Sequence, residues 1–141
     1  MSQIEWDESL DINNTEINDQ HKRWIDIYNR LDSVMLADDL VSETRITEKT
    51  LLLMLDYTRY HFTFEEELLS KMGYPGIVGH VRLHNAFNDR IYQSYRDVCA
   101  GRIVLNAELL KMIKTWLLNH ILVEDKKYSM FASDHKQQAG A

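Results

Sequence analysis

The stretch LLLMLDYTRYHFTFEEELLSKMGYPG, residues 51–76, is the part of the sequence that predicts the fold most directly. Its apolar side chains recur every three or four residues, a spacing typical of an amphipathic helix. The same stripe carries His61 and Glu65, and GYPG at 73–76 ends the pattern because glycine and proline interrupt helices. We therefore predict a helix from about residue 43 to 72 that turns a histidine and a carboxylate towards its buried face.

The rest of the chain repeats this pattern with few interruptions. Three further helices are predicted, over about 18–38, 77–99 and 106–131. Asn18 or Asp19 can cap the first of them. One proline and five glycines in the whole chain favour an all-α fold over a sheet. Residues 1–18 are then an N-terminal arm and 132–141 a polar tail, so that 1–141 is a single domain.

Short connections between long helices favour antiparallel neighbours, which predicts an up-down-up-down four-helix bundle. This topology places five of the six histidines at the same end of the bundle: His21, His61, His80, His84 and His120. Buried imidazoles need a partner for each polar nitrogen. A shared role for these histidines is therefore expected.

The bulk composition excludes several classes of protein. A formal charge of −6 argues against a nucleic-acid-binding protein, which needs a basic face. No apolar run approaches the ~20 residues of a membrane-spanning helix, so we expect no membrane insertion. Cys99 is the only cysteine, and MSQIEWDESL at the N-terminus lacks the features of a signal peptide. We expect a cytoplasmic protein.

Residues four apart on a helix lie about 6 Å apart on one face, which suits two ligands of a common metal ion. Two pairs have this spacing, His61 with Glu65 and His80 with His84. His120 and Asp125 are five residues apart and would diverge by about 140° on an ideal helix, so spacing alone favours Glu124. A single pair is most often an ordinary surface or core pair. The convergence of several pairs indicates a metal centre.

The number and type of these side chains narrow the choice of metal. Zinc needs about four ligands, fewer than gather here. Imidazole with carboxylate suits iron, and carboxylates can bridge two metal ions. The Glu-x-x-His motifs of ferritin-like di-iron proteins are missing from the sequence. A histidine-rich pair of irons fits better.

Four segments resemble, in order, the ligand motifs of the hemerythrin family, in particular its single-domain bacterial members. They are INDQH at 17–21, HFTFE at 61–65, HVRLH at 80–84 and HILVED at 120–125. GYP at 73–75, WLLNHI at 116–121 and the arm with Trp6 also resemble family segments. The family often has aspartate where this chain has Asn18. Since both residues cap helices, this departure concerns a cap and not the ligand set.

The resemblance implies a ligand set and a function. It implies that His80, His84 and His120 hold one iron, that His21 and His61 hold the other, and that Glu65 and Asp125 bridge them together with an oxo or hydroxo group. Five histidines, two bridging carboxylates and one bridging oxygen leave one position open, on the iron with two histidines. Family membership implies that dioxygen binds there reversibly, for carriage, storage or delivery and not for an enzymatic reaction.

Three side chains near this layer are candidates for lining the oxygen pocket: Trp24, Trp116 and Ile121. Ordinary core packing is an equally good interpretation of them. Glu66 and Glu67 rotate off the stripe and are interpreted as solvated surface, and His135 is expected to bind nothing. The alternatives for function are a sensor that acts through a separate partner, an oxidoreductase for peroxide or nitric oxide, and an iron buffer. We expect a monomer or a weak oligomer.

Overall fold

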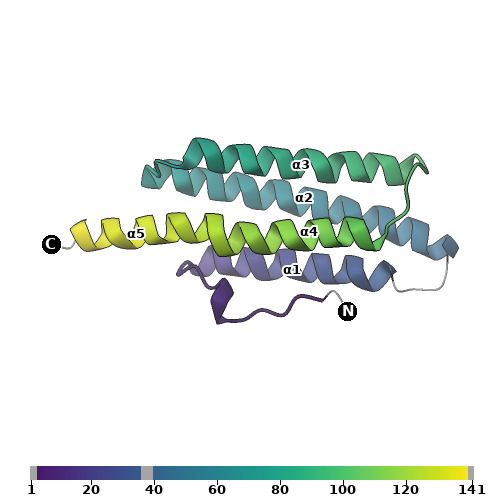
Figure 1. The fold of residues 1–141 in the computed structure, drawn as a ribbon, viewed down its shortest axis with the longest axis horizontal. Helices are drawn as coiled ribbons and strands as arrows, with labels where there is room; N and C mark the ends of the chain where they lie inside the picture. The colour runs from purple at the N-terminus through teal and green to yellow at the C-terminus, as the bar shows by residue number, and fades with distance from the viewer. Residues whose placement is uncertain (1–2, 36–39, 140–141) are drawn as a thin grey trace.

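The structure is a computed structural model that describes the backbone of residues 3–35 and 40–139 and the side chains of residues 3–35 and 45–135. Its elements in chain order are the short 3-10 helix η1 (Glu8–Leu10), α1 (Thr15–Met35), α2 (Leu40–Met72), α3 (Ile77–Cys99), α4 (Ala107–Asn119), the π-helical segment η2 (His120–Asp125) and α5 (Lys126–Ala139). Figure 1 shows α1, α2, α3 and the continuous rod of α4, η2 and α5 packed lengthwise. The predicted all-α, antiparallel four-helix bundle with an N-terminal arm is confirmed.

The start of α1 differs from the prediction. The helix begins at Thr15, and Asn14 caps it by accepting the backbone N–H of Ile17 on Oδ1 at 3.0 Å. Asn18 instead holds the arm: its Nδ2 donates to Oδ1 of Asp11 at 2.7 Å, and its Oδ1 accepts the N–H of Ile12 at 3.1 Å. The predicted cap at Asn18 or Asp19 is therefore wrong, because the residue that looks like a cap binds the preceding loop.

The other helix ends follow local chemistry. Gly73, with φ of 68°, ends α2, and the N–H of Tyr74 donates to the carbonyl of Leu69 at 3.0 Å, as in a Schellman motif. Asn106 caps α4 through its side chain. The last helix continues to Ala139, beyond the predicted end near residue 131, since no glycine or proline lies between 132 and 139. The predicted end of the first helix near residue 38 lies outside the described residues.

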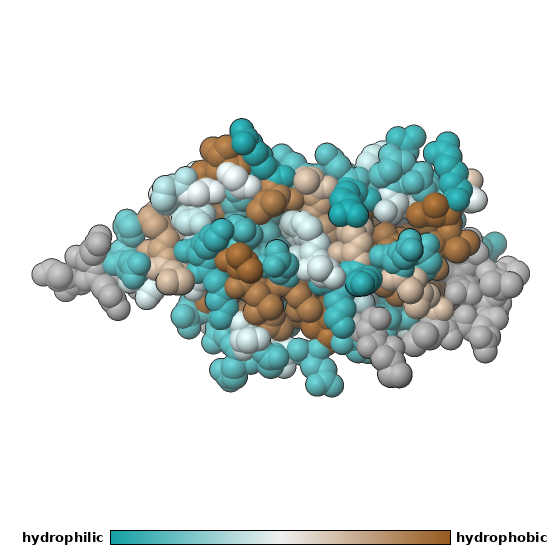
Figure 2. All heavy atoms as spheres, in the orientation of Figure 1, coloured by the Kyte–Doolittle hydropathy of each residue, from teal (hydrophilic) through white to brown (hydrophobic). Residues whose placement is uncertain are grey.

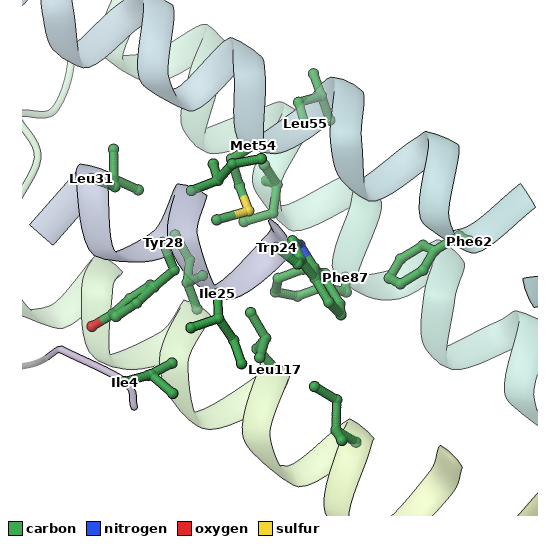
Figure 3. Close-up of a cluster of buried hydrophobic side chains, with 14 of the residues drawn as sticks. Ile4, Trp24, Ile25, Tyr28, Leu31, Met54, Leu55, Phe62, Phe87 and Leu117 are labelled. Atoms are coloured by element: carbon green, nitrogen blue, oxygen red, sulfur yellow. The ribbon is translucent and has the colours of Figure 1, made fainter. Parts of the chain in front are cut away.

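The core runs along the whole bundle axis. Trp24, Tyr28 and Leu31 from α1 meet Met54 and Leu55 from α2, with residues of α3 and α4 closing the layer (Figure 3). Full burial of one such side chain contributes about 1.5–3 kcal/mol. The arm is fixed to α1 by two hydrogen bonds between Ile4 and the side chain of Asn29, at 2.8 and 2.9 Å.

The surface shown in Figure 2 is mostly polar, with hydrophobic residues in separate groups. Among the described helices, none combines the length and the apolar character needed to span a membrane.

Candidate metal centre

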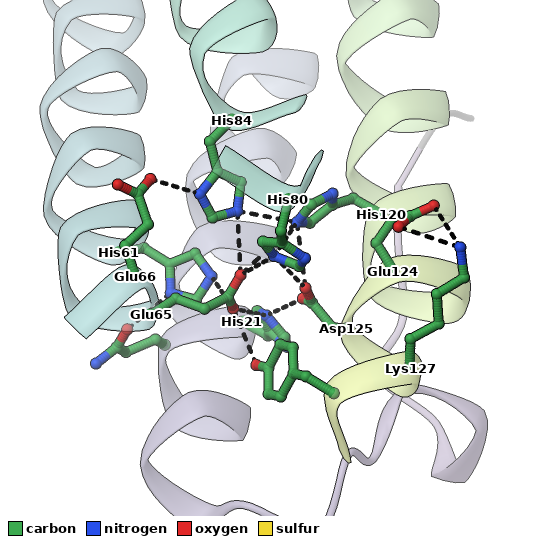
Figure 4. Close-up of polar contacts among 12 residues, drawn as sticks. His21, His61, Glu65, Glu66, His80, His84, His120, Glu124, Asp125 and Lys127 are labelled. Atoms are coloured by element: carbon green, nitrogen blue, oxygen red, sulfur yellow. Dashed lines mark hydrogen bonds and ion pairs between the residues drawn. The ribbon is translucent and has the colours of Figure 1, made fainter. Parts of the chain in front are cut away.

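All four rods of the bundle send ionisable side chains into one buried layer (Figure 4). These are His21 of α1, His61 and Glu65 of α2, His80 and His84 of α3, and His120 and Asp125 of η2. None is more than 3% exposed. The structure thus brings together every side chain that was predicted as a metal ligand. So many buried ionisable groups at one place require compensation.

The layer contains two groups of side chains that could each hold a metal ion. One consists of Glu65, His80, His84 and His120, and the other of His21, His61, Glu65 and Asp125. Within each group, the potential ligand atoms lie within 4.8 Å of one another. We call them the three-histidine group and the two-histidine group. Glu65 belongs to both.

In the three-histidine group, the ring nitrogens converge on one point. The Nε2 atom of His120 lies 3.0 Å from Nε2 of His84 and 3.2 Å from Nε2 of His80. Three imidazole nitrogens this close together, with Glu65 alongside, are an arrangement typical of ligands around an ion.

The two oxygens of Glu65 face different groups. Its Oε1 lies 2.6 Å from Nε2 of His80 and 3.1 Å from Nε2 of His84, whereas Oε2 lies 3.3 Å from Nε2 of His61 and 3.9 Å from that of His21. A carboxylate that presents one oxygen to each of two groups is placed as a bridging ligand.

The two oxygens of Asp125 also face different groups. Its Oδ1 lies 3.3 Å from Nε2 of His80 and 3.1 Å from Nε2 of His120, and its Oδ2 lies 3.0 Å from Nε2 of His21. Two carboxylates therefore span the same pair of histidine groups.

The backbone of η2 explains why Asp125, and not Glu124, reaches the layer. Residues 120–125 are π-helical, and the i to i+5 hydrogen bonding of a π-helix brings residues five apart onto one face. Asp125 is fully buried, whereas the side chain of Glu124 is 24% exposed and pairs with Lys127 at 3.3 Å. The preference of ideal-helix spacing for Glu124 is wrong here because the helix is not ideal. The family motif was the signal that identified Asp125.

The layer carries two negative charges balanced by histidines. Burial alone would raise the pKa of Glu65, but the neighbouring histidines, His61 first, hold the pKa well below its usual value. Burial and the charge of Glu65 also raise the pKa of Asp125, yet His120 and His21 together outweigh them and the net shift is downward. Burial lowers the pKa of His120, but Asp125 and Glu65 together overcome this and raise it to about 10. Without a metal ion, protons on the histidines offset the carboxylates.

The polar atoms of the two-histidine group fit a metal ion. In the described part of the chain, no hydrogen bond of regular geometry reaches Nε2 of His21, Nε2 of His61 or either oxygen of Asp125, although opposing atoms lie within 3.3 Å. Buried polar atoms rarely stay without such bonds. Burial lowers the pKa of His21, which favours the neutral imidazole that metal ligation needs. A cation between these atoms would satisfy them.

Three supporting contacts were not predicted from the sequence. The Nδ1–H of His61 donates to Oε1 of Gln20 at 2.7 Å, and the Nδ1–H of His84 donates to Oε2 of Glu66 at 2.8 Å. The hydroxyl of Tyr128 donates to Oε2 of Glu65 at 3.0 Å. Such partners orient metal-ligating side chains.

The interpretation of Glu66 as solvated surface is therefore wrong. Its side chain is 31% exposed, but His84 of the neighbouring helix α3 lies close enough to bind it. The sequence offered one indication of these supporting residues: Glu66 and Gln20 are each next to a predicted ligand, Glu65 and His21 respectively.

Aromatic side chains of the hydrophobic core pack against the histidines of the buried layer. Trp116 stacks on His120, with ring centres 4.5 Å apart, and Phe62 stacks on His84 at 3.7 Å. The ring of Trp24 lies 5.2 Å from that of His61, and its Nε1–H donates to Oγ1 of Thr58 at 3.0 Å. Ile121 is fully buried.

Comparison with known proteins connects this geometry to one family. The family model of the hemerythrin HHE cation binding domain matches residues 13–132. The chain is 31% identical to a bacteriohemerythrin of Stenotrophomonas maltophilia over 98% of this chain and 87% of that protein. It is 32% identical to a hemerythrin-like protein of Naegleria gruberi, over 90% of this chain and 92% of that protein. A crystal structure of wild-type hemerythrin superposes with a TM-score of 0.81 at 26% identity, covering 89% of this chain and 95% of that one. With the family model spanning most of its length and a metal-binding layer in place, the chain belongs to the hemerythrin family.

Proposed function

We propose that the two groups hold a pair of iron ions and that the protein binds dioxygen reversibly, for carriage, storage or delivery. The observation that carries this proposal is the division of the Glu65 and Asp125 oxygens between the three-histidine and two-histidine groups. Two shared carboxylates suit two ions held side by side. When bound, the iron pair would supply the electrons that dioxygen accepts and returns.

In this proposal each side chain has a defined role. His80, His84 and His120 would hold one ion, His21 and His61 would hold the other, and Glu65 and Asp125 would each offer one oxygen to either ion. Both carboxylates are anionic, since their pKa values lie below the usual range. The two-histidine group has one histidine fewer than the three-histidine group and shares the same two carboxylates, so an open position for a small molecule is expected on its side.

Trp24, Trp116 and Ile121 are proposed to line the oxygen pocket. Trp24 lies beside the ring of His61, and Trp116 covers the face of His120. Large apolar side chains at these places exclude water, and a dry site limits the loss of reduced oxygen that would make binding irreversible. The role proposed for this lining is protection of a binding site, and not catalysis.

The composition supports a cytoplasmic setting as part of the same proposal. An exposed free cysteine, Cys99, is compatible with a reducing compartment. We propose a monomer or weak oligomer, which analytical ultracentrifugation of the loaded protein would test.

The test is a cycle of oxygenation. The iron-loaded protein is reduced without air, exposed to air and degassed again, while the visible charge-transfer absorption is followed. A band that appears and disappears over repeated cycles supports the proposal, and immediate irreversible bleaching contradicts it. Metal analysis should give two irons per chain, and one zinc per chain would exclude the iron pair. Turnover of peroxide or nitric oxide with a reductant would favour an oxidoreductase instead.

A matched pair of variants tests the site itself. His61→Ala removes one of the two histidines from the two-histidine group and should abolish reversible oxygenation. His135→Ala is the control, because this exposed histidine lies outside both groups and its Nδ1–H donates to the carbonyl of Phe131 on its own helix. Unchanged oxygenation in His61→Ala would contradict the assignment.

A further inference from the structure

The hydrogen bonds around the candidate ligands differ in charge between the two groups. In the three-histidine group, His84 donates its Nδ1–H to the carboxylate of Glu66 at 2.8 Å. In the two-histidine group, His61 donates its Nδ1–H to the neutral amide oxygen of Gln20 at 2.7 Å. An imidazole that donates to a carboxylate becomes a stronger metal ligand than one that donates to an amide, because the negative charge increases its basicity.

The remaining histidine partners do not offset this difference. Of the three remaining histidines, His80 and His21 each have a buried Nδ1 without a hydrogen-bond partner among the described residues, and the contacts of His120 in the layer are made through its Nε2. His80 belongs to the three-histidine group and His21 to the two-histidine group. The charge contrast between Glu66 and Gln20 therefore remains.

Tyr128 adds a contribution in the same direction. Its buried hydroxyl donates to Oε2 of Glu65, the oxygen that faces His61 and His21, and not to Oε1, which faces His80 and His84. A hydrogen bond to one carboxylate oxygen draws electron density from it and weakens it as a ligand. Glu65 is thus the weaker donor on the two-histidine side.

We propose that Glu66, Gln20 and Tyr128 act as positioning residues that polarise the metal pair. The three-histidine group receives the stronger electron donation, and the ion of the two-histidine group is left the stronger Lewis acid. This inference rests on the proposed function, because it requires an ion in each group. The ion that receives less electron donation is then the one on the side where a small ligand is expected to bind. When the pair holds one ferric and one ferrous ion, the ferric ion is favoured in the three-histidine group, which donates more strongly.

The test exchanges the two partners. The double variant Gln20→Glu with Glu66→Gln keeps the net charge and leaves an oxygen acceptor at both positions. It moves the carboxylate partner from His84 to His61 and the amide partner from His61 to His84, with little change of shape. The oxidised iron-loaded protein is reduced by one electron per pair with a titrated reductant, and azide is added as the probe. The azide-to-iron(III) absorption, normalised to that of the fully oxidised protein, reports how often the azide-binding ion is ferric.

In the parent protein this normalised absorption should be small, because the ferric ion is in the three-histidine group. Each substitution should shift the ratio of the two valence arrangements by about tenfold towards a ferric ion in the two-histidine group. Tyr128→Phe should shift it in the same direction by a smaller factor. Glu67→Gln is the matched control, since it makes the same chemical change at an exposed neighbour and should leave the ratio unchanged.

The inference is overturned if the half-reduced parent already shows the full absorption of the oxidised protein. It is also overturned if the parent and the double variant show the same normalised absorption. If the double variant loses iron, the two single variants test the inference instead. Both are expected to shift the ratio of the two valence arrangements in the same direction. The measurement uses no dioxygen. A protein that fails the oxygenation cycle but shows the shift keeps this inference and loses the proposed function, and a protein without two irons loses both.

Discussion

The two ends of the bundle are built from the same four rods but are filled by opposite chemistry. At one end, Leu31, Leu51, Ile91 and Leu110 are fully buried and pack against one another's helices. At the other end, five histidines and two carboxylates occupy the equivalent space. Apolar burial stabilises the fold without help, whereas buried ionisable groups cost free energy unless each is satisfied. The apolar end should therefore hold the fold, and the histidine end should depend on what it binds.

The largest expected effect comes from removing the metal. Stripping the loaded protein with a chelator under reducing conditions should lower the free energy of unfolding by about 5 kcal/mol or more, since binding free energy is also folding free energy. The loss should be concentrated at the histidine end. Amide hydrogen exchange should accelerate around residues 61–65 and 120–125 and change little around residues 28–31. Uniform acceleration along every helix would mean that the two ends are not energetically distinct.

A cavity at the apolar end should cost less and should not depend on metal. Leu51→Ala removes a fully buried side chain and is expected to lower the free energy of unfolding by about 3 kcal/mol. Leu52→Ala, one residue along the same helix at a position that is 39% exposed, is the control and should change it by less than about 0.5 kcal/mol. Denaturant unfolding of loaded and metal-free protein measures both. A cost that disappears on metal removal would contradict the separation of the two ends.

The metal-free histidine end should depend on pH at both extremes. Asp125 and Glu65 raise the pKa of His120 to about 10, so the contribution of protonated His120 to stability is fully present below about pH 6.5 and is lost as the pH rises through 10. The pKa values of Glu65 and Asp125 are depressed, so their contributions are present above about 4 and are lost as the pH falls further.

Thermal unfolding of the metal-free protein from pH 3 to 11 should therefore give a broad maximum, with a loss of stability at alkaline pH as His120 loses its proton. The loaded protein should lack the alkaline loss, because the ion and not a proton then offsets the carboxylates. The same alkaline loss in both forms would show that the histidine layer holds no metal.

Regular helices made most of this architecture predictable. The stripes around His61 and His84 follow the 3.6-residue period, so the sequence alone indicated which side chains turn inward and that they meet at one end. The contacts of Gln20, Glu66 and Tyr128 cross from one helix to another. Their distances depend on how the helices pack, and no spacing within one helix encodes that.

The departures from prediction arise where local geometry is irregular. Asn18 resembles a cap, but the arm folds back to meet it and the helix begins earlier. The π-helical turn of η2 changes which residue after His120 faces the layer. A π turn is stabilised by its surroundings rather than by a distinctive local pattern, so single-sequence spacing favoured Glu124.

The smallest expected effect tests this last point on two adjacent carboxylates. Glu124→Gln removes a partly exposed ion pair with Lys127 and should change the free energy of unfolding by less than about 0.5 kcal/mol, with unchanged iron content. Asp125→Asn makes the same chemical change one residue later, at a buried position that faces both histidine groups, and should lower the iron content measurably. Metal analysis of the two purified variants measures the contrast. Equal iron loss in both would mean that Glu124 also reaches the layer and that the π turn does not select one carboxylate. Both substitutions replace a carboxylate with its amide, so a difference in iron content reports which of the two side chains the backbone of η2 turns towards the layer.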